Sequence, residues 1–296
     1  MERRPRVTVI IPTFNRSAWL KEAVYSVANQ TFTNIELIVA DDGSDDDTPE
    51  IVSQFPYPVR HLRLAHSGRP SVVRNRALDA SRGDLVAFLD DDDLWVPEKL
   101  EEQVALFERR PQLDFVYCDA RAVNAAGQLS GPLLSPPQKQ PERLFDALLA
   151  SCFIYPSTIM ASRQRLLAAG GFDESLPIVE DYDLWLRLAY QGRAGFVPAS
   201  AVTVRRHEQG ISARRRRQTA EGTIRVLTRV WRDMQLTGRQ RLLLRRSLAR
   251  SHTHLALFLC EAGELPEARQ HFRRAVRWNP LRPRAWLEMF KLWLAQ

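Results

Sequence analysis

The sequence contains few cysteines and no cysteine motif. Cys118, Cys152 and Cys260 are odd in number and widely separated, and no Cys-x-x-Cys pair occurs. The sequence therefore indicates neither a disulfide framework nor a zinc site of paired cysteines. This pattern is typical of a reducing compartment, and we expect a cytoplasmic protein.

Long hydrophobic runs are also missing. The basic start, Met1 to Arg6, precedes an apolar run at residues 7–11 that ends at Pro12 and is too short for the core of a signal peptide. No other stretch reaches the roughly 18 apolar residues that a membrane-spanning helix needs. We therefore expect a soluble protein or one bound peripherally to the inner face of the cell membrane.

The overall composition is that of a globular protein. With 45% hydrophobic and 26% charged residues, the chain can bury a sizeable core, and its 296 residues suit one large α/β domain with an appendage. The net charge of +7 favours anionic partners such as nucleotides or an acidic membrane face, although an arginine-rich proteome would explain it equally well. We expect no nucleic-acid partner.

Short apolar strands alternate with helices from Val7 to about residue 125. This alternation predicts a mainly parallel, Rossmann-like α/β sheet flanked by helices. The expected strands are residues 7–11, 35–40, 85–89 and 113–118. The expected helices are residues 18–29, 48–55, 71–81 and 97–109.

Carboxylates follow two of these expected strands. Asp90 to Asp93 form an unbroken acidic run after residues 85–89, and Asp41 and Asp42 follow residues 35–40. Ligands bind at the carboxyl ends of strands in open parallel sheets, so both clusters are expected in one crevice. Adjacent carboxylates repel one another unless a cation or a proton intervenes, which favours a divalent metal. The alternative is a solvated acidic turn that caps the next helix.

The chain is expected to be wholly helical after about residue 219. The segment 252–280 has small and aromatic residues at the spacing of a helix-turn-helix repeat of roughly 34 residues, and it resembles a single tetratricopeptide unit. These residues are Ala256, Gly263, Ala268, Phe272, Ala275 and Pro280. Trp286, Phe290 and Trp293 form a helical apolar stripe, which predicts a core or homodimer face, with a membrane-surface anchor as the alternative.

Five motifs in order resemble family 2 glycosyltransferases. They are Val-Ile-Ile-Pro-Thr-Phe-Asn-Arg, Asp-Asp-Gly-Ser, Arg-Asn-Arg-Ala, Phe-Leu-Asp-Asp-Asp-Asp and Glu-Asp-Tyr-Asp-Leu-Trp. The resemblance covers about residues 5–215 and implies the GT-A fold, a nucleotide-diphospho-sugar donor, a divalent cation and inversion at the anomeric carbon. We expect a transferase domain at 1–215, with a nucleotide-binding half at 1–125 and an acceptor half at 126–215. A helical extension is expected at 216–296.

The resemblance also implies roles for individual residues around the donor. Pro12, Thr13 and Asn15 would border the nucleoside, and Asp41 or Asp42 would hold the base. Arg74, Asp90 and Asp91 would bind the nucleotide sugar. Asp92 would bind the metal, Mn²⁺ or Mg²⁺, and His207 would approach it. Oxygen ligands suit either ion, which stabilises the charge that develops on the departing diphosphate.

A carboxylate must also take the proton of the acceptor hydroxyl as that oxygen attacks the sugar. The resemblance places this base at Asp181, with Glu180 as the second candidate. Both residues could instead be acidic charges favoured by the positive end of a helix dipole. Trp95, just past the acidic run, could form a sugar platform or simply pack in the core.

These features together predict a metal-dependent inverting transferase of the hexosyltransferase type. It would move one sugar from the donor to a hydroxyl of a glycan or lipid-linked acceptor in cell-surface polysaccharide or glycolipid synthesis. Two alternatives stay open. One is a non-catalytic nucleotide-sugar-binding scaffold that acts through its helical repeat, and the other is an aspartate-nucleophile phosphatase, which would usually carry a threonine after the acidic motif.

Overall fold

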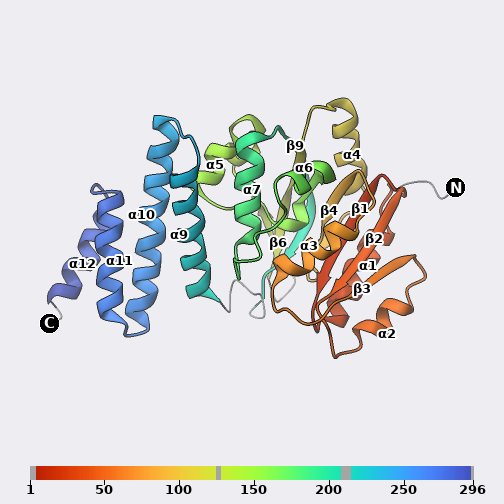
Figure 1. Ribbon diagram of the computed structural model, residues 1–296, viewed down its shortest axis with the longest axis horizontal. Helices are drawn as coiled ribbons and strands as arrows, with labels where there is room; N and C mark the ends of the chain where they lie inside the picture. Colours follow the sequence, from red (N-terminus) through yellow and green to blue (C-terminus); the bar gives the residue numbers. More distant parts are fainter. Residues whose placement is uncertain (1–4, 125–127, 208–214, 295–296) are drawn as a thin grey trace. The chain divides into compact units, whose positions relative to one another are not determined.

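The computed structural model describes residues 5–124, 128–207 and 215–294 (Figure 1). The chain divides into two compact units, which are described separately below. The first unit comprises residues 1–145 and 153–208, and the second comprises residues 146–152 and 209–296.

Four parallel strands in the order β3-β2-β1-β4 form the start of the first unit. They are β1 (Val7–Thr13), β2 (Ile35–Asp41), β3 (Val59–Arg63) and β4 (Leu85–Phe88). Side chains alternate between the two faces of a strand, so Val7, Val9 and Ile11 of β1 enter one core cluster. Thr13 pairs in register with Asp41, which brings the loops that follow β1 and β2 to the same edge of the sheet.

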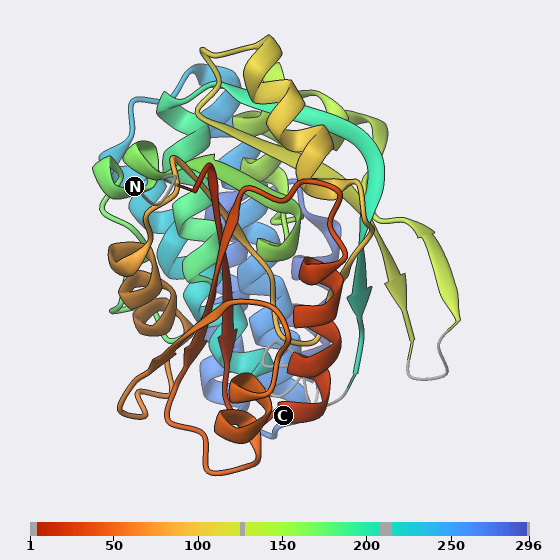
Figure 2. The ribbon, with the colours of Figure 1, turned by 90° about the vertical axis from the view of Figure 1, so that its right-hand side faces the viewer.

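Helices flank these strands, as the view in Figure 2 shows for α1 and α3. In α1, the buried residues Leu20, Ala23, Val24 and Val27 lie on one face because their spacing matches the helical period. The helices between the strands are α1 (Ser17–Ala28), α2 (Thr48–Ser53) and α3 (Pro70–Ala80), and α4 (Lys99–Arg109) follows the acidic run.

The sheet continues beyond β4 as a mixed portion, in the order β4-β8-β6-β9-β5, with β7 beside β6. Its strands are β5 (Leu94–Trp95), β6 (Phe115–Val123), β7 (Leu129–Pro132), β8 (Ile159–Ser162) and β9 (Ala194–Arg205). Strand β8 runs antiparallel to β4 and β6, whereas β6 and β9 are parallel. The predicted α/β class, a mixed and mainly parallel sheet flanked by helices, is confirmed.

Several helices and turns complete the first unit. The segment that follows β7 contains the short 3-10 helices η1 (Pro136–Lys139) and η2 (Pro141–Arg143). The remaining elements are η3 (Pro156–Thr158), α6 (Arg163–Ala168) and α7 (Glu180–Gln191), while α5 (Leu144–Ala150) spans the boundary of the two units.

The second unit is helical, as expected. It contains α9 (Arg216–Asp233), α10 (Gly238–Glu261), α11 (Leu265–Trp278) and α12 (Pro283–Leu294). Ala256, Phe272, Ala275 and Ala285 form a buried cluster that joins α10, α11 and α12. The helical extension is therefore confirmed, while the tetratricopeptide assignment stays a prediction.

Within the described residues, no helix is both long enough and apolar enough to cross a bilayer. The longest, α10, has 24 residues but carries five arginines between residues 239 and 250.

Candidate active site

Asn15 ties together the loops that follow β1 and β2. Its backbone N–H donates to Ser44 Oγ (3.0 Å), and its Oδ1 accepts from the Asp45 N–H (2.9 Å). The φ of Asn15 is 52°, in the left-handed region that asparagine tolerates better than most residues. Asn15 is exposed and Pro12 is half-buried at this edge of the sheet. Pro12 and Asn15, two of the three residues predicted to border the nucleoside, therefore lie at the edge where β1 and β2 end.

Asp41 and Asp42 are both buried and both serve the loop that surrounds them. Asp41 Oδ1 accepts from the Ser44 N–H (2.8 Å). Asp42 accepts from the backbone N–H groups of Ser67 and Gly68, each at 2.8 Å. Asp42 Oδ1 also accepts from Ser67 Oγ (2.8 Å), and Asp41 Oδ2 lies 3.1 Å from His61 Nε2, so much of the acceptor capacity of both carboxylates is used within the protein.

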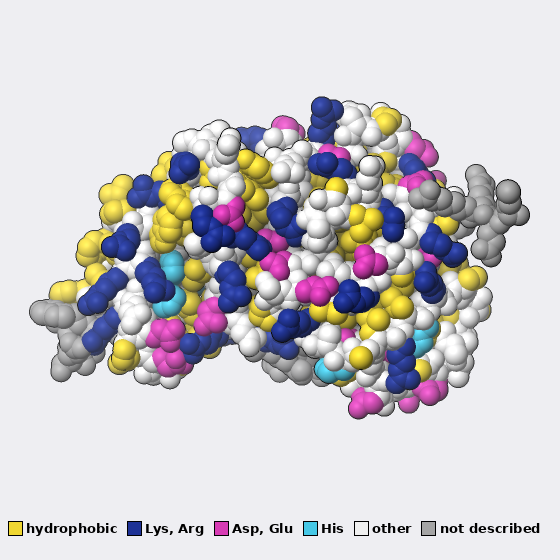
Figure 3. All heavy atoms as spheres, in the orientation of Figure 1, with side chains coloured by type: hydrophobic (Ala, Val, Ile, Leu, Met, Phe, Trp, Pro, Cys, Tyr) yellow, Lys and Arg dark blue, Asp and Glu magenta, His cyan; other side chains and the backbone are white. Residues whose placement is uncertain are grey.

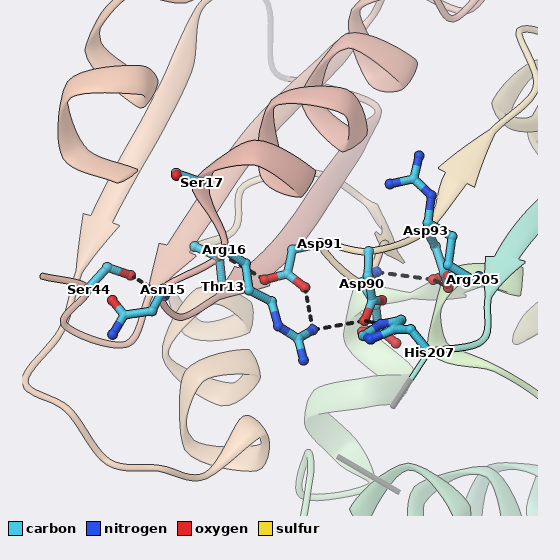
Figure 4. A network of polar contacts seen from close by, with 12 residues as sticks. Thr13, Asn15, Arg16, Ser17, Ser44, Asp90, Asp91, Asp93, Arg205 and His207 are labelled. Atoms are coloured by element: carbon cyan, nitrogen blue, oxygen red, sulfur yellow. Dashed lines mark hydrogen bonds and ion pairs between the residues drawn. The ribbon is translucent and has the colours of Figure 1, made fainter. Parts of the chain in front are cut away.

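Asp91 and Asp92 of the acidic run share one arginine. Thr13 Oγ1 donates to Asp91 Oδ2 (2.8 Å), and Arg16 Nη1 donates to Asp91 Oδ1 (3.0 Å) and Asp92 Oδ2 (2.8 Å) (Figure 4). Arg16 was not among the predicted site residues, although it directly follows Asn15 in the first motif. Its position after β1 lets it reach the end of the neighbouring strand β4.

Asp93 is anchored by the scaffold. Ser157 Oγ donates to Asp93 Oδ2 (2.5 Å) and accepts from the Asp90 N–H (3.0 Å), while the Arg205 N–H donates to Asp93 Oδ1 (3.2 Å). The run is thus fixed by η3 on one side and by the end of β9 on the other. Sequence reasoning missed Ser157, because no motif marks it.

His207 lies against the acidic run. Its Nε2 is 3.0 Å from Asp92 Oδ2, and its ring packs edge-on against Trp19 with centroids 4.2 Å apart. The other ring nitrogen, Nδ1, is buried and has no hydrogen-bond partner among the residues that the structure describes. The structure therefore brings together the two residues predicted to bind the metal.

The acidic run carries more negative charge than its arginines offset. Burial, together with neighbouring aspartates, raises the pKa of Asp91 to about 7 and the pKa of Asp93 well above its usual value. Burial also raises the pKa of Asp90, although Arg74 and Arg16 oppose this shift. A site that leaves buried carboxylates undercompensated is suited to an additional cation.

Arg74 connects three elements of the unit. It lies in α3, donates from Nη2 to Asp90 Oδ1 (2.6 Å) after β4, and donates from Nη1 to Glu180 Oε1 (2.6 Å) at the start of α7. Arg74 is buried, and the charges of both carboxylates raise its pKa against the effect of burial. The guanidinium thereby links the acidic run to the predicted base.

The predicted base lies next to a strained residue. Val179 has φ 61°, which is rare for a β-branched residue and marks local strain. Glu180 is buried and held by Arg74, whereas Asp181 is half-buried and accepts a hydrogen bond from the Tyr182 N–H (2.7 Å). Burial and the charge of Glu180 raise the pKa of Asp181 to about 7. A carboxyl group with this pKa can exchange protons near neutral pH.

The described residues contain no group of three or more His, Cys, Asp or Glu side chains arranged to hold a metal. Asp92 and His207 nevertheless supply an oxygen and a nitrogen donor side by side. These donor types suit divalent cations such as Mn²⁺ and Mg²⁺, whose remaining positions can be filled by substrate oxygens and water. The undercompensated acidic run and the unpartnered His207 Nδ1 also fit such an ion.

Trp95 is a packing residue rather than a sugar platform. It is 5% exposed, its Nε1 donates to the Ser157 carbonyl (2.8 Å), and the Lys99 Nζ lies 3.6 Å from the centroid of its ring. The sequence left both roles open, and the burial of Trp95 decides between them.

Solved structures share this fold at low sequence identity. S. aureus TarS matches with a TM-score of 0.71 and 20% identity, over 94% of this chain and 50% of that chain. The mannosyltransferase PcManGT from Pyrobaculum calidifontis, in complex with GDP-Man and Mn²⁺, matches with a TM-score of 0.63 and 21% identity, over 99% of this chain and 81% of that chain. Likeness at this identity supports the GT-A fold alone.

Curated relatives are more similar in sequence. An uncharacterized glycosyltransferase of Haemophilus influenzae is 31% identical over 62% of this chain and 61% of its own length. The Escherichia coli protein named UDP-Glc:alpha-D-GlcNAc-diphosphoundecaprenol beta-1,3-glucosyltransferase WfgD is also 31% identical, over 62% of this chain and 69% of its own length. The chain spans about three fifths of the length of the first of these relatives.

The match that decides the family covers the acidic run and every strand of the sheet except β9 and the first residue of β1. The model of the family described as Glycosyl transferase family 2 matches residues 8–168, which is more than half of the chain. The matched segment contains both acidic clusters and Arg74. This chain belongs to glycosyl transferase family 2.

Proposed function

We propose that this protein is a metal-dependent inverting hexosyltransferase. It would move one sugar from a nucleoside-diphosphate sugar to a hydroxyl group of a growing cell-surface glycan or glycolipid. The observation that carries the proposal is the double ion pair of Arg74, which holds the acidic run next to the half-buried Asp181. We assign this activity to residues 1–215.

The donor would lie along the carboxyl ends of β1, β2 and β4. Pro12, Thr13 and Asn15 would border the nucleoside, and Asp41 or Asp42 would accept a hydrogen bond from the base. A uridine nucleotide comes first among the donors to test, because WfgD is named for UDP-Glc and a TarS structure is in complex with UDP-GlcNAc.

Asp92 and His207 would hold the divalent cation, which stabilises the negative charge that develops on the departing diphosphate. Asp90 and Asp91 would lie beside the sugar diphosphate. Arg74 fixes Asp90, and Arg16 fixes Asp91 at the end of β4, so neither carboxylate needs to reorganise during the reaction.

Asp181 would act as the base. Its carboxylate takes the proton of the acceptor hydroxyl while that oxygen forms a bond to the anomeric carbon, and the bond from that carbon to the phosphate oxygen breaks on the opposite face. A single displacement of this kind inverts the configuration. Glu180 is less suited to the role because it is buried and its Oε1 already accepts a hydrogen bond from Arg74 at 2.6 Å.

We further propose a lipid-linked glycan as the acceptor class. The support is the name of WfgD, whose acceptor is a GlcNAc-diphosphoundecaprenol. A synthetic GlcNAc-diphosphate lipid and its lipid-free sugar would test whether the lipid contributes to recognition.

The experiment is an assay of nucleoside diphosphate release from a panel of nucleotide sugars in the presence of Mn²⁺ and acceptor. We expect release by the wild-type protein and a loss of at least about 100-fold in Asp92→Ala and Asp181→Asn. Asp79→Asn, which changes an exposed aspartate of α3, is the matched control and should retain full activity. Donor binding without release, with every acceptor offered, would instead favour a non-catalytic scaffold.

A further inference from the structure

Helix α12 has apolar side chains on two opposite faces. Ala285 is buried and Met289 is partly buried against the cluster shared with α10 and α11. The other face carries Trp286, Leu287 and Phe290, whose exposed fractions are 48%, 54% and 54%. These three lie within about one and a half turns of the helix, so they form one continuous exposed patch.

The second unit carries a strong excess of positive charge. Residues 216–296 contain sixteen arginines and one lysine but only six acidic residues, whereas residues 1–215 contain 25 basic and 29 acidic residues. Figure 3 shows basic side chains over α10 to α12, interspersed with hydrophobic ones. The net positive charge of the protein therefore resides in its helical unit.

Three of these arginines repel one another beside α12, and they also act on His254. Burial and the charges of Arg250, Arg282 and Arg284 lower the pKa of His254, and Arg250 and Arg284 also act on Arg282 in the same direction. Arg282 Nε donates to Thr253 Oγ1 (3.0 Å), which fixes this guanidinium between α10 and α12. An anion bound here would relieve the repulsion among groups that remain charged at neutral pH.

We propose that the exposed face of α12, together with Arg250, Arg282 and Arg284, docks on an anionic lipid membrane. The arginines would bind lipid phosphates, and Trp286, Leu287 and Phe290 would enter the interface between head groups and acyl chains. An amphipathic helix that combines aromatic and aliphatic residues with flanking basic residues has the composition of an interfacial membrane element.

The charge distribution favours a membrane over other occupants. A second copy of this chain would bring two strongly positive helical units together, and their repulsion opposes a homodimer through α12. A nucleic acid would neutralise the arginines but would leave the aliphatic patch in water. An anionic bilayer satisfies both the charge and the apolar area at once.

The test is flotation of the full-length protein with vesicles, which requires no enzymatic activity. We expect binding to vesicles of phosphatidylglycerol and phosphatidylcholine in equal parts, little binding to pure phosphatidylcholine, and weakening of the binding as salt rises from about 0.1 M to about 0.5 M. Free phosphatidylglycerol head group or inorganic phosphate should compete only weakly, because neither supplies acyl chains.

Variants then separate the two contributions. Arg282→Gln with Arg284→Gln should lower vesicle affinity about 25-fold, and Leu287→Ser with Phe290→Ser should lower it more than tenfold. Matched controls in the first unit are Arg109→Gln with Arg110→Gln, and Leu129→Ser, all at exposed positions, and these should bind as the wild type does.

Three results would overturn the proposal. The first is equal binding to neutral and anionic vesicles, and the second is an affinity that the α12 variants leave unchanged. The third is a wild-type dimer in light scattering that Leu287→Ser with Phe290→Ser dissociates, which would assign the patch to self-association. Circular dichroism of each variant checks its folding, and the salt and lipid dependence of the wild type tests the proposal without any variant.

Discussion

The ion pairs of Arg74 offer a direct test of how the candidate active site is held together. Arg74→Met removes the charge and both hydrogen bonds while keeping a long apolar side chain over the same space. The side chains of Arg74 and Glu180 are each 7% exposed, and that of Asp90 is 28% exposed. Loss of the arginine therefore leaves one deeply buried carboxylate and one partly solvated carboxylate without their cation.

The expected cost follows from this difference in exposure. Removing one partner of a buried ion pair costs about 3–5 kcal/mol, whereas a well-solvated pair contributes at most about 1 kcal/mol. Water screens part of the pair with Asp90, whose side chain is 28% exposed, so we expect a total near the lower end, about 3 kcal/mol. For a unit of this size, that loss lowers the melting temperature by roughly 6–12 °C.

Scanning calorimetry of the wild type and Arg74→Met measures this change in the transition of the first unit. Arg76→Met, two residues along α3 and 53% exposed, is the matched control and should change stability by less than about 0.5 kcal/mol. Glu180→Gln should cost about 2 kcal/mol less in the Arg74→Met background than in the wild type. The reasoning is refuted if Arg74→Met costs no more than Arg76→Met, or if the effects of the two substitutions simply add.

Three further predictions concern single residues of the site. Burial raises the pKa of Asp181 in the folded protein to about 7, above its value of about 3.9 in the unfolded chain. The wild type therefore loses stability as the pH rises from about 3.9 to about 7. The melting temperature of Asp181→Asn relative to wild type should therefore be higher at about pH 8 than at about pH 5, and a constant difference would contradict the assignment. Gly43→Ala should lower the free energy of unfolding by about 1–3 kcal/mol, because φ of Gly43 is 78° and a Cβ would lie 3.0 Å from the His66 backbone nitrogen. Chemical denaturation measures this change, and an unchanged midpoint would show that the turn adapts. Val179→Gly should leave stability unchanged or raise it by up to about 1 kcal/mol, because glycine relieves the strain at φ 61°. This gain should at least offset the larger conformational entropy that glycine gives the unfolded chain. A clear loss of stability would show that the packing of this valine outweighs the strain.

The sequence predicted those strands that are buried along nearly their whole length. The runs at 7–11, 35–40 and 85–89 are apolar and β-branched, and each became a strand of the sheet. Strand β9 was missed because Gly195 and Pro198 weaken its local preference for a strand. It forms because β6 pairs with it on both sides of a register shift near Cys118, and this long-range pairing accommodates the proline.

The candidate site shows the same division between local pattern and tertiary contact. The carboxylates of β2 and β4 could be placed at one edge of the sheet because parallel strands end there. Their partners could not be predicted, because Arg16 and Ser157 reach them from segments 75 and 64 residues away in sequence. Several arginines could have reached Asp90, and only the packing of α3 against the sheet selects Arg74.

The four consecutive aspartates form two pairs that differ in exposure and in their contacts. Asp91 and Asp93 are 5% and 3% exposed and accept hydroxyl hydrogen bonds from Thr13 and Ser157 respectively, so they fix the turn after β4 to the scaffold. The side chains of Asp90 and Asp92 are 28% and 16% exposed and face arginine and histidine groups. The Asp93 N–H donates to the Asp90 carbonyl (3.0 Å) and closes a turn, and within this turn the scaffold-bound and the more exposed aspartates alternate. The scaffold contacts of the two buried members therefore also keep the more exposed pair in place.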